Sequence, residues 1–217
     1  MSTPVQLAER AYHRCVFAGD AGEVDAALRG LVGDAPATLL ARGKLLHARF
    51  LADRDATDER DRRAESACFD RALAGFRAAG DRRGQAQALF WQGCYWQVVA
   101  GEHARADGPL AAAAKLSEDC GDDLTRSYAL RHLGIAKHRA GELRAAREFL
   151  EQSTRLRREL AFAEGVAANL VGLSYIALGE GRADDAVRHA DEAAELARRT
   201  GADAVLGQAE AARAAAG

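Results

Sequence analysis

Glycine-led turns recur along this 217-residue chain at a nearly constant interval. Gly101, Gly141 and Gly181 lie 40 residues apart, and each is followed directly by a charged residue. A second set of markers falls between these turns and repeats every 40 or 41 residues: Gly80, Gly121, Ala161 and Gly201. A repeat of this length cannot cover its own apolar face alone, so the period predicts supersecondary units that stack on one another.

The segment from Tyr128 to Leu156 shows what one unit contains. Apolar residues recur every three or four positions on both sides of Gly141, which indicates two amphipathic helices folded back on each other. Gly134 and Ala146 are small, so the two helices can approach closely, whereas larger side chains there would force them apart. The repeating unit is therefore predicted to be a helical hairpin.

The composition supports an all-α fold. Hydrophobic residues make up 48% of the chain but aromatic residues only 6%, so the interior must consist mainly of alanine and leucine. Only 3 prolines interrupt the chain, which leaves long stretches for helix. Valine and isoleucine are few and do not alternate with polar residues as strands require. We expect one solenoid domain spanning residues 1–217.

We expect this domain to contain five hairpins and a final helix. Their approximate ranges are 4–33, 36–80, 84–120, 124–160 and 164–200, followed by a capping helix at 203–216. The charged stretch from Asp53 to Arg63 is interpreted as an insertion in the second hairpin, with the helix resuming near Ala64. We expect it to form a solvated loop, and a role as a lid over a bound ligand stays open. Asp203 is expected to cap the final helix.

The residues at fixed offsets within each unit resemble those of the tetratricopeptide repeat (TPR) family. In the central unit Gly134 precedes the turn glycine by seven positions and Ala146 follows it by five. Ser174 and Ala186 hold the same offsets in the fifth unit, and the resemblance is strongest over residues 84–200. The period exceeds the family's usual length of about 34 residues, and the proline between repeats is missing. This longer form is similar to repeats of bacterial regulators and peptide sensors.

The resemblance implies a right-handed superhelical solenoid in which the first helix of each hairpin lines a concave groove. The positions that match the family's groove residues are Lys44, His47, Phe90, Cys94, Gln97, Tyr128, Arg131, His138 and Tyr175. Cations and aromatic groups dominate this set, and such a surface suits an extended peptide with carboxylate and apolar side chains. The leading expectation is a non-catalytic scaffold that binds a protein or peptide segment.

Charge and hydropathy argue against other classes of partner. The formal net charge is −2, and no basic block favours nucleic acid. No run of apolar residues approaches the length of about 20 residues needed to span a membrane. The first residues lack the basic-then-apolar order of a secretory signal. We therefore expect a cytoplasmic protein that binds neither nucleic acid nor membrane.

No motif for a metal or cofactor is found. The cysteines lie far apart without a C-x-x-C pair, at Cys15, Cys68, Cys94 and Cys120. His132 and His138 are six residues apart, whereas a helical zinc pair needs a spacing of four. Phosphate-binding glycine loops and nucleophile motifs are also missing from the sequence. No cofactor and no metal is expected, and the thiols are expected to be reduced.

Three alternatives stay open from the sequence. The first is a sensor subunit whose curvature responds to a ligand and changes its association with a partner such as a transcriptional regulator. The second is an enzyme on the same scaffold, with His47, His138 and Tyr175 as acid–base groups. The third is a homo-oligomer that associates through Trp91, Trp96 or the final repeat.

Overall fold

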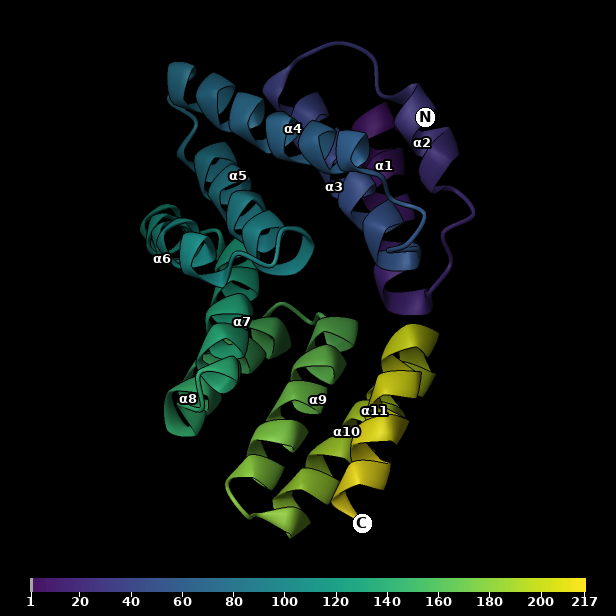
Figure 1. The fold of residues 1–217 in the computed structure, drawn as a ribbon, viewed down its shortest axis with the longest axis vertical. Coiled ribbons are helices and arrows are strands. Elements are labelled where there is room, and N and C mark those ends of the chain that lie inside the picture. The colour runs from purple at the N-terminus through teal and green to yellow at the C-terminus, as the bar shows by residue number, and fades with distance from the viewer. Residues whose placement is uncertain (1) are drawn as a thin grey trace. The chain divides into compact units, whose positions relative to one another are not determined.

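The computed structural model describes residues 2–217, and their regular structure is entirely helical (Figure 1). Eleven α-helices cover this part of the chain, and two of them, α1 and α5, continue into short π-helical segments, η1 and η2. The chain divides into two compact units, an N-terminal unit at Met1–Thr125 and a C-terminal unit at Arg126–Gly217. Each unit is described by itself below.

The N-terminal unit contains three helical hairpins. In chain order its elements are α1 (Pro4–His13), η1 (Arg14–Ala18), α2 (Val24–Gly30), α3 (Pro36–Ala52), α4 (Glu59–Ala78), α5 (Arg82–Cys94), η2 (Tyr95–Val99) and α6 (His103–Cys120). Within this unit α3 packs against α4, α4 against α5, and α5 against α6. Its core includes many alanines, among them Ala8, Ala11, Ala41 and Ala48, as the composition predicts.

The C-terminal unit contains two further hairpins and a final helix. Its elements are α7 (Asp123–Arg139), whose first turn precedes the unit boundary, α8 (Leu143–Glu159), α9 (Ala163–Gly179), α10 (Ala183–Thr200) and α11 (Asp203–Ala216). The last three helices lie side by side, and α11 packs against both α9 and α10 (Figure 1). Five successive hairpins and a final helix are thereby confirmed. The single domain expected over residues 1–217 stays a prediction.

Small residues recur where the two helices of a hairpin meet. A Cβ placed on Gly43 would lie 2.4 Å from the Phe69 ring, and one on Gly134 would lie 2.1 Å from Leu150 Cδ1. Ser174 holds the same position in the fifth hairpin, where its hydroxyl donates a 2.8 Å hydrogen bond to a backbone carbonyl of α10. The close approach predicted from the repeat offsets is therefore present.

Left-handed residues follow the second helix of the second to fifth hairpins, whereas α2 of the first hairpin ends at an extended Leu31. Gly80, Gly121 and Gly201 each have a φ of 67°, and Ala161 takes the corresponding place with a φ of 54°. The backbone N–H after this residue bonds back to a carbonyl five positions earlier, as from Phe162 to Arg157 at 2.9 Å. This is the Schellman geometry, in which glycine is favoured because it has no Cβ.

Ala161 is the one non-glycine residue with positive φ among residues 2–217. Left-handed backbone costs an L-residue about 1–2 kcal/mol, so Ala161→Gly is expected to raise the free energy of unfolding by about 0.5–1 kcal/mol after the entropy of the unfolded chain is counted. Urea denaturation followed by circular dichroism measures this gain. Ala211→Gly, at an exposed position within α11, is the matched control and should lose a similar amount. Destabilisation by Ala161→Gly would contradict the strain argument.

The loop in the second hairpin is shorter than the sequence predicted, because part of the charged stretch is helical. Helix α4 begins at Glu59 rather than near Ala64, so the loop comprises only residues 53–58. Asp58 is the N-cap, and its carboxylate accepts a 2.8 Å hydrogen bond from the Asp61 backbone N–H. Acidic residues in the first turn also favour the positive end of the helix. The lid role stays a prediction.

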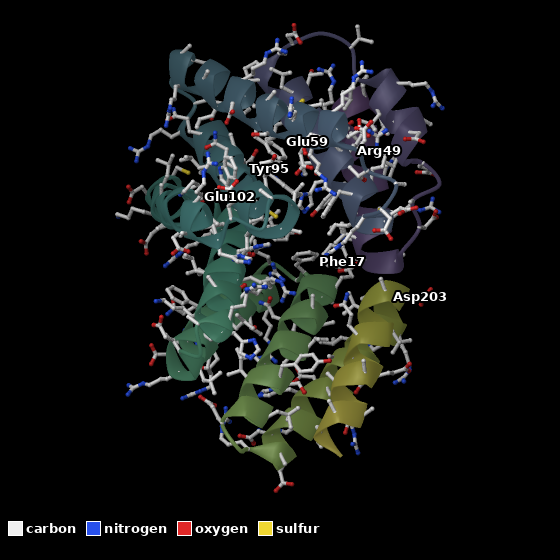
Figure 2. All side chains as sticks on the ribbon, viewed as in Figure 1. Phe17, Arg49, Glu59, Tyr95, Glu102 and Asp203 are labelled. Atoms are coloured by element: carbon white, nitrogen blue, oxygen red, sulfur yellow. The ribbon has the colours of Figure 1, made fainter. Side chains whose placement is uncertain are left out.

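Asp203 does not cap the final helix, contrary to the expectation. It is the first residue of α11 (Figure 2), and the N-cap position is taken by Ala202, which makes no side-chain capping bond. Ala202 is almost completely buried, so a small apolar residue suits that place. The Asp203 carboxylate still lies in the first turn, where the helix dipole favours it. None of the helices described here is long and apolar enough to cross a membrane.

Candidate functional site

The predicted groove residues of the N-terminal unit lie mostly in its interior. Lys44 and His47 are on α3, Phe90 and Cys94 are on α5, and Gln97 is on η2. The exposed fraction is 2% for His47, 3% for Phe90 and Cys94, and 6% for Gln97. Their role in binding a ligand stays a prediction, and their surroundings show what holds them in place.

The Lys44 ammonium is held by side chains of the same unit. It forms an ion pair with Glu9, and its Nζ lies 5.1 Å from the ring centroid of Tyr12 and 5.7 Å from that of Trp91. Contacts of this kind attract a cation to the face of an aromatic ring. Lys44 therefore links α3 to α1 and α5.

Trp91 belongs to the core and not to an association surface. It is 6% exposed and stacks on Phe69 with a centroid distance of 5.6 Å. Trp96 is half-buried, and the Arg105 guanidinium lies 3.3 Å from its ring centroid. Self-association through Trp91, one of the alternatives from the sequence, is wrong because burial makes its side chain unreachable for a second copy.

His47 lies between a carboxylate and a thiol. Its Nδ1 is 2.8 Å from Glu65 Oε1 on α4, and its Nε2 is 3.6 Å from Cys94 Sγ on α5. Burial disfavours the imidazolium, but the Cys94 sulfur and the Glu65 carboxylate outweigh it and raise the pKa of His47 to about 10. We call these three side chains the thiol–imidazole–carboxylate cluster.

Sequence reasoning named His47 and Cys94 but missed Glu65. The signal was present, because Glu65 lies on the apolar stripe of α4 together with Cys68, Phe69 and Ala72. An acid at a core position of an amphipathic helix requires a partner when buried. Over residues 2–217 the structure shows no group of three or more His, Cys, Asp or Glu side chains that could hold a metal ion.

The predicted residues of the C-terminal unit lie nearer the surface. Tyr128, Arg131 and His138 on α7 are half-buried, and Tyr175 on α9 is 38% exposed. Arg131 Nη1 donates to the Ala168 carbonyl at 2.7 Å, which ties α7 to α9. Burial lowers the pKa of Arg131 to about 10, so the guanidinium remains a cation at neutral pH. Tyr175 is the most exposed of the four.

A buried polar network lies behind this surface, and sequence reasoning missed it. Asn169 Oδ1 accepts hydrogen bonds from Arg131 at 3.1 Å and from Arg157 at 3.0 Å. Its Nδ2 donates to Ser153 Oγ at 2.8 Å, and that hydroxyl donates to the Ser127 carbonyl at 2.6 Å. These bonds join α7, α8 and α9. Asn169 is the single amide side chain in an otherwise apolar stretch of α9, which was the available signal.

Arg157 is the largest fully buried side chain of this network. Its Nη1 donates to the Gly165 carbonyl at 2.7 Å, and its guanidinium carbon lies 4.8 Å from the Tyr128 ring centroid and 5.5 Å from that of Phe162. The Tyr128 ring therefore has a structural role. It covers a buried cation, in addition to any contact with a partner.

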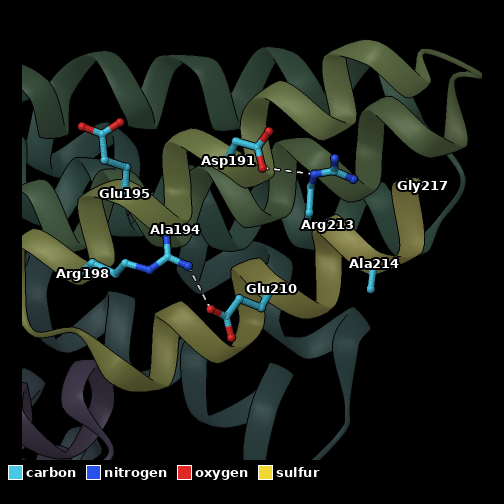
Figure 3. A pocket seen from close by; sticks show the side chains of 8 residues that line it. All are labelled: Asp191, Ala194, Glu195, Arg198, Glu210, Arg213, Ala214 and Gly217. Atoms are coloured by element: carbon cyan, nitrogen blue, oxygen red, sulfur yellow. Dashed lines mark hydrogen bonds and ion pairs between the residues drawn. The ribbon is translucent and has the colours of Figure 1, made fainter.

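A shallow hollow lies between α10 and α11 (Figure 3). Its lining residues are Asp191, Ala194, Glu195, Arg198, Glu210, Arg213, Ala214 and Gly217. Arg198 pairs with Glu210 at 3.0 Å and Arg213 with Asp191 at 3.1 Å, so four of its charges are matched across the two helices. None of the predicted groove residues lines it. These pairs hold the final helix to the fifth hairpin.

Comparisons with known proteins identify the type of repeat. No family model matches the chain, and no curated protein matches it. The chain is similar to a crystal structure of nearly identical TPR-like repeats of a putative kinesin light chain from Podosopora anserina, solved as a point variant. The TM-score is 0.55 at 14% identity, over 92% of this chain and 98% of that one. A second structure of these repeats gives a TM-score of 0.53 at 14% identity, over 92% and 99%. At such low identity the likeness concerns the fold alone, and the chain has a TPR-like fold of sequential helical hairpins.

Proposed function

We propose that this chain is a non-catalytic cytoplasmic scaffold that binds a protein or peptide segment on the first helices of its hairpins. TPR-like folds typically bind proteins, and a preformed helical surface leaves most of the ordering cost to the partner. The observation that carries the proposal is Tyr175. It is 38% exposed, whereas the adjacent Ser174 and Ile176 are buried. Aromatic side chains held at a rigid surface are frequent anchors of binding energy.

The charges near this surface suggest the chemistry of the segment. The last turn of α7 carries Lys137, His138 and Arg139, and Arg131 adds a cation further back on the same helix. Lys137 is paired with Glu142 at 2.9 Å, while the side chain of Arg139 is exposed. A segment with an apolar side chain for Tyr175 and a carboxylate for the α7 cations fits both features.

Tyr175→Ala and His138→Ala are expected to weaken binding of such a segment by about tenfold each, because a truncated anchor costs about 1–2 kcal/mol. A displayed library of random peptides, selected on the intact protein, supplies a probe whose affinity fluorescence polarisation measures. Tyr175 is exposed and His138 is half-buried, so neither truncation empties the core, and circular dichroism should show an unchanged fold.

Leu160→Ala is the matched control for these variants. Leu160 is 42% exposed, similar to Tyr175, but follows the second helix of its hairpin. Its replacement should leave the affinity unchanged. Equal affinities for Tyr175→Ala, His138→Ala and the unmodified protein would contradict the proposed surface.

A further inference from the structure

In the thiol–imidazole–carboxylate cluster, the thiol contacts the imidazole and the imidazole contacts the carboxylate, which is the arrangement of an activated nucleophile. The Glu65 carboxylate lies 2.8 Å from Nδ1 of His47, so the N–H on that nitrogen donates to it and Nε2 faces the sulfur of Cys94 at 3.6 Å. A nucleophile beside a base that a third group orients is the arrangement that generates thiolates in proteins. The three side chains come from three packed helices, α3, α4 and α5, which fix their geometry.

The backbone is irregular directly beside the thiol. Cys94 is the last residue of α5, and η2 begins at Tyr95 (Figure 2) with π-helical hydrogen bonding. Single π-helical turns are rare and occur frequently at functional sites. Cys15 also lies in a π-helical turn, η1, so the irregular backbone accompanies the cluster and does not by itself distinguish Cys94.

Over residues 2–217 the structure shows none of the other three cysteines beside an imidazole; the cations Arg42 and Arg71 lie near Cys68, but burial outweighs their effect on its pKa. Burial raises the pKa of both Cys15 and Cys68. The Cys15 thiol donates to the Ala48 carbonyl at 3.4 Å, which keeps its proton in place. Cys120 is the most exposed thiol, and it donates to the Ser117 carbonyl at 3.7 Å. Exposure alone would therefore make Cys120 the first thiol to react, whereas activation would favour Cys94.

Charged groups around the ring support a thiolate–imidazolium pair. Glu65 and Cys94 face the imidazole directly, and Lys44, one turn earlier on α3, is paired with Glu9 over the Trp91 ring. The Trp91 ring lies 5.3 Å from the His47 ring. The Cys94 thiolate and the Glu65 carboxylate raise the pKa of His47 against the effect of burial, so the imidazolium forms as a pair with the thiolate.

We propose that Cys94 is a reactive thiol site that small uncharged peroxides oxidise to a sulfenic acid. The thiolate sulfur attacks one peroxide oxygen, an S–O bond forms, and the O–O bond breaks. Sulfur is oxidised by two electrons, the peroxide is reduced, and the leaving hydroxide takes the proton of the His47 imidazolium to become water. Cys94 is only 3% exposed, so an oxidant must be small to reach the thiol. His47 supplies the proton in this reaction, and Glu65 is a positioning residue that orients the imidazole.

The test exposes the intact protein to hydrogen peroxide and traps sulfenic acid with dimedone, and mass spectrometry follows each cysteine separately. Cys94 should react at least about tenfold faster than Cys120 at neutral pH, and its rate should change little between pH 6.5 and 8, where an ordinary thiol with a pKa of about 8.5 becomes faster. A Cys94 rate at or below that of Cys120 would overturn the proposal. This measurement uses no peptide, so its outcome is separate from that of the proposed scaffold function.

Glu65→Gln tests whether the carboxylate activates the Cys94 thiol or only supports the fold. Glutamine keeps the size of the side chain and an oxygen that accepts from Nδ1, but it removes the negative charge. The Cys94 rate should fall by about tenfold at neutral pH and recover as the pH rises, while the Cys120 rate stays constant. An unchanged Cys94 rate in a folded Glu65→Gln protein would show that the carboxylate does not activate the thiol. The pH profile of the unmodified protein still tests the proposal if this variant does not fold.

Discussion

Arg157→Ala is expected to lower the free energy of unfolding by about 3–5 kcal/mol. Arg157 is 1% exposed, and its Nη1 supplies hydrogen bonds to the Gly165 carbonyl at 2.7 Å and Asn169 Oδ1 at 3.0 Å. Alanine leaves these acceptors with fewer donors and opens a void beneath the rings of Tyr128 and Phe162. Each buried polar group that loses its partner costs about 1–3 kcal/mol, and lost packing adds to this.

Arg155→Ala is the matched control on the same helix. Its side chain is exposed, so its loss should change the free energy of unfolding by no more than about 0.5 kcal/mol. Urea denaturation of both variants, followed by circular dichroism, gives the difference. Similar midpoints for the two would show that the buried guanidinium contributes no more than a surface arginine.

Gly134→Val is expected to cost about 3 kcal/mol, because it overpacks the contact between α7 and α8. Even the Cβ would lie 2.1 Å from Leu150 Cδ1 and 3.2 Å from the Ala146 carbonyl oxygen. Leu150 has little room to move, since it is 1% exposed and a Cβ on Gly172 of α9 would also meet it, at 2.6 Å. The two helices must therefore separate, and the midpoint of urea denaturation measures the loss.

Gly207→Ala is the control for this change. Gly207 lies within α11, and a Cβ there would meet nothing within 4 Å. Alanine should raise the free energy of unfolding by about 0.5–1 kcal/mol through helix propensity alone. Opposite signs for the two substitutions are expected, and stabilisation by Gly134→Val would contradict the packing argument.

The repeat period made most of the fold predictable. Turn glycines need positive φ and packing positions need small side chains, and both requirements leave residues at fixed offsets that a single sequence displays. The start of α4 was missed because the charged residues after Asp58 read as loop. A solvated first helical turn that carries acidic residues has the same amino-acid composition as a charged loop. The predicted Asp203 cap failed by one residue, within the usual uncertainty of helix ends.

The candidate site was predictable only in part. Periodicity placed His47, Cys94 and Arg131 on first helices, but it does not tell which way a helix is rotated, since one residue turns it by about 100°. Cys94 and His47 are buried against α4, while Tyr175 remains at the surface. Glu65 comes from the second helix of its hairpin, and Asn169 lies on the buried side of a first helix, so no pattern within one repeat connected them to the groove.

The sequence by itself determined the helical hairpins, their number, their turns and the small residues between paired helices. These depend on local backbone preference and on contacts within one repeat, which recur at the same offsets every 40 residues. Only the tertiary structure decided that His47 meets Glu65 and Cys94 and that Arg157 meets Asn169. Such contacts join different helices through side-chain direction, and each is made once, so no period in the sequence records it.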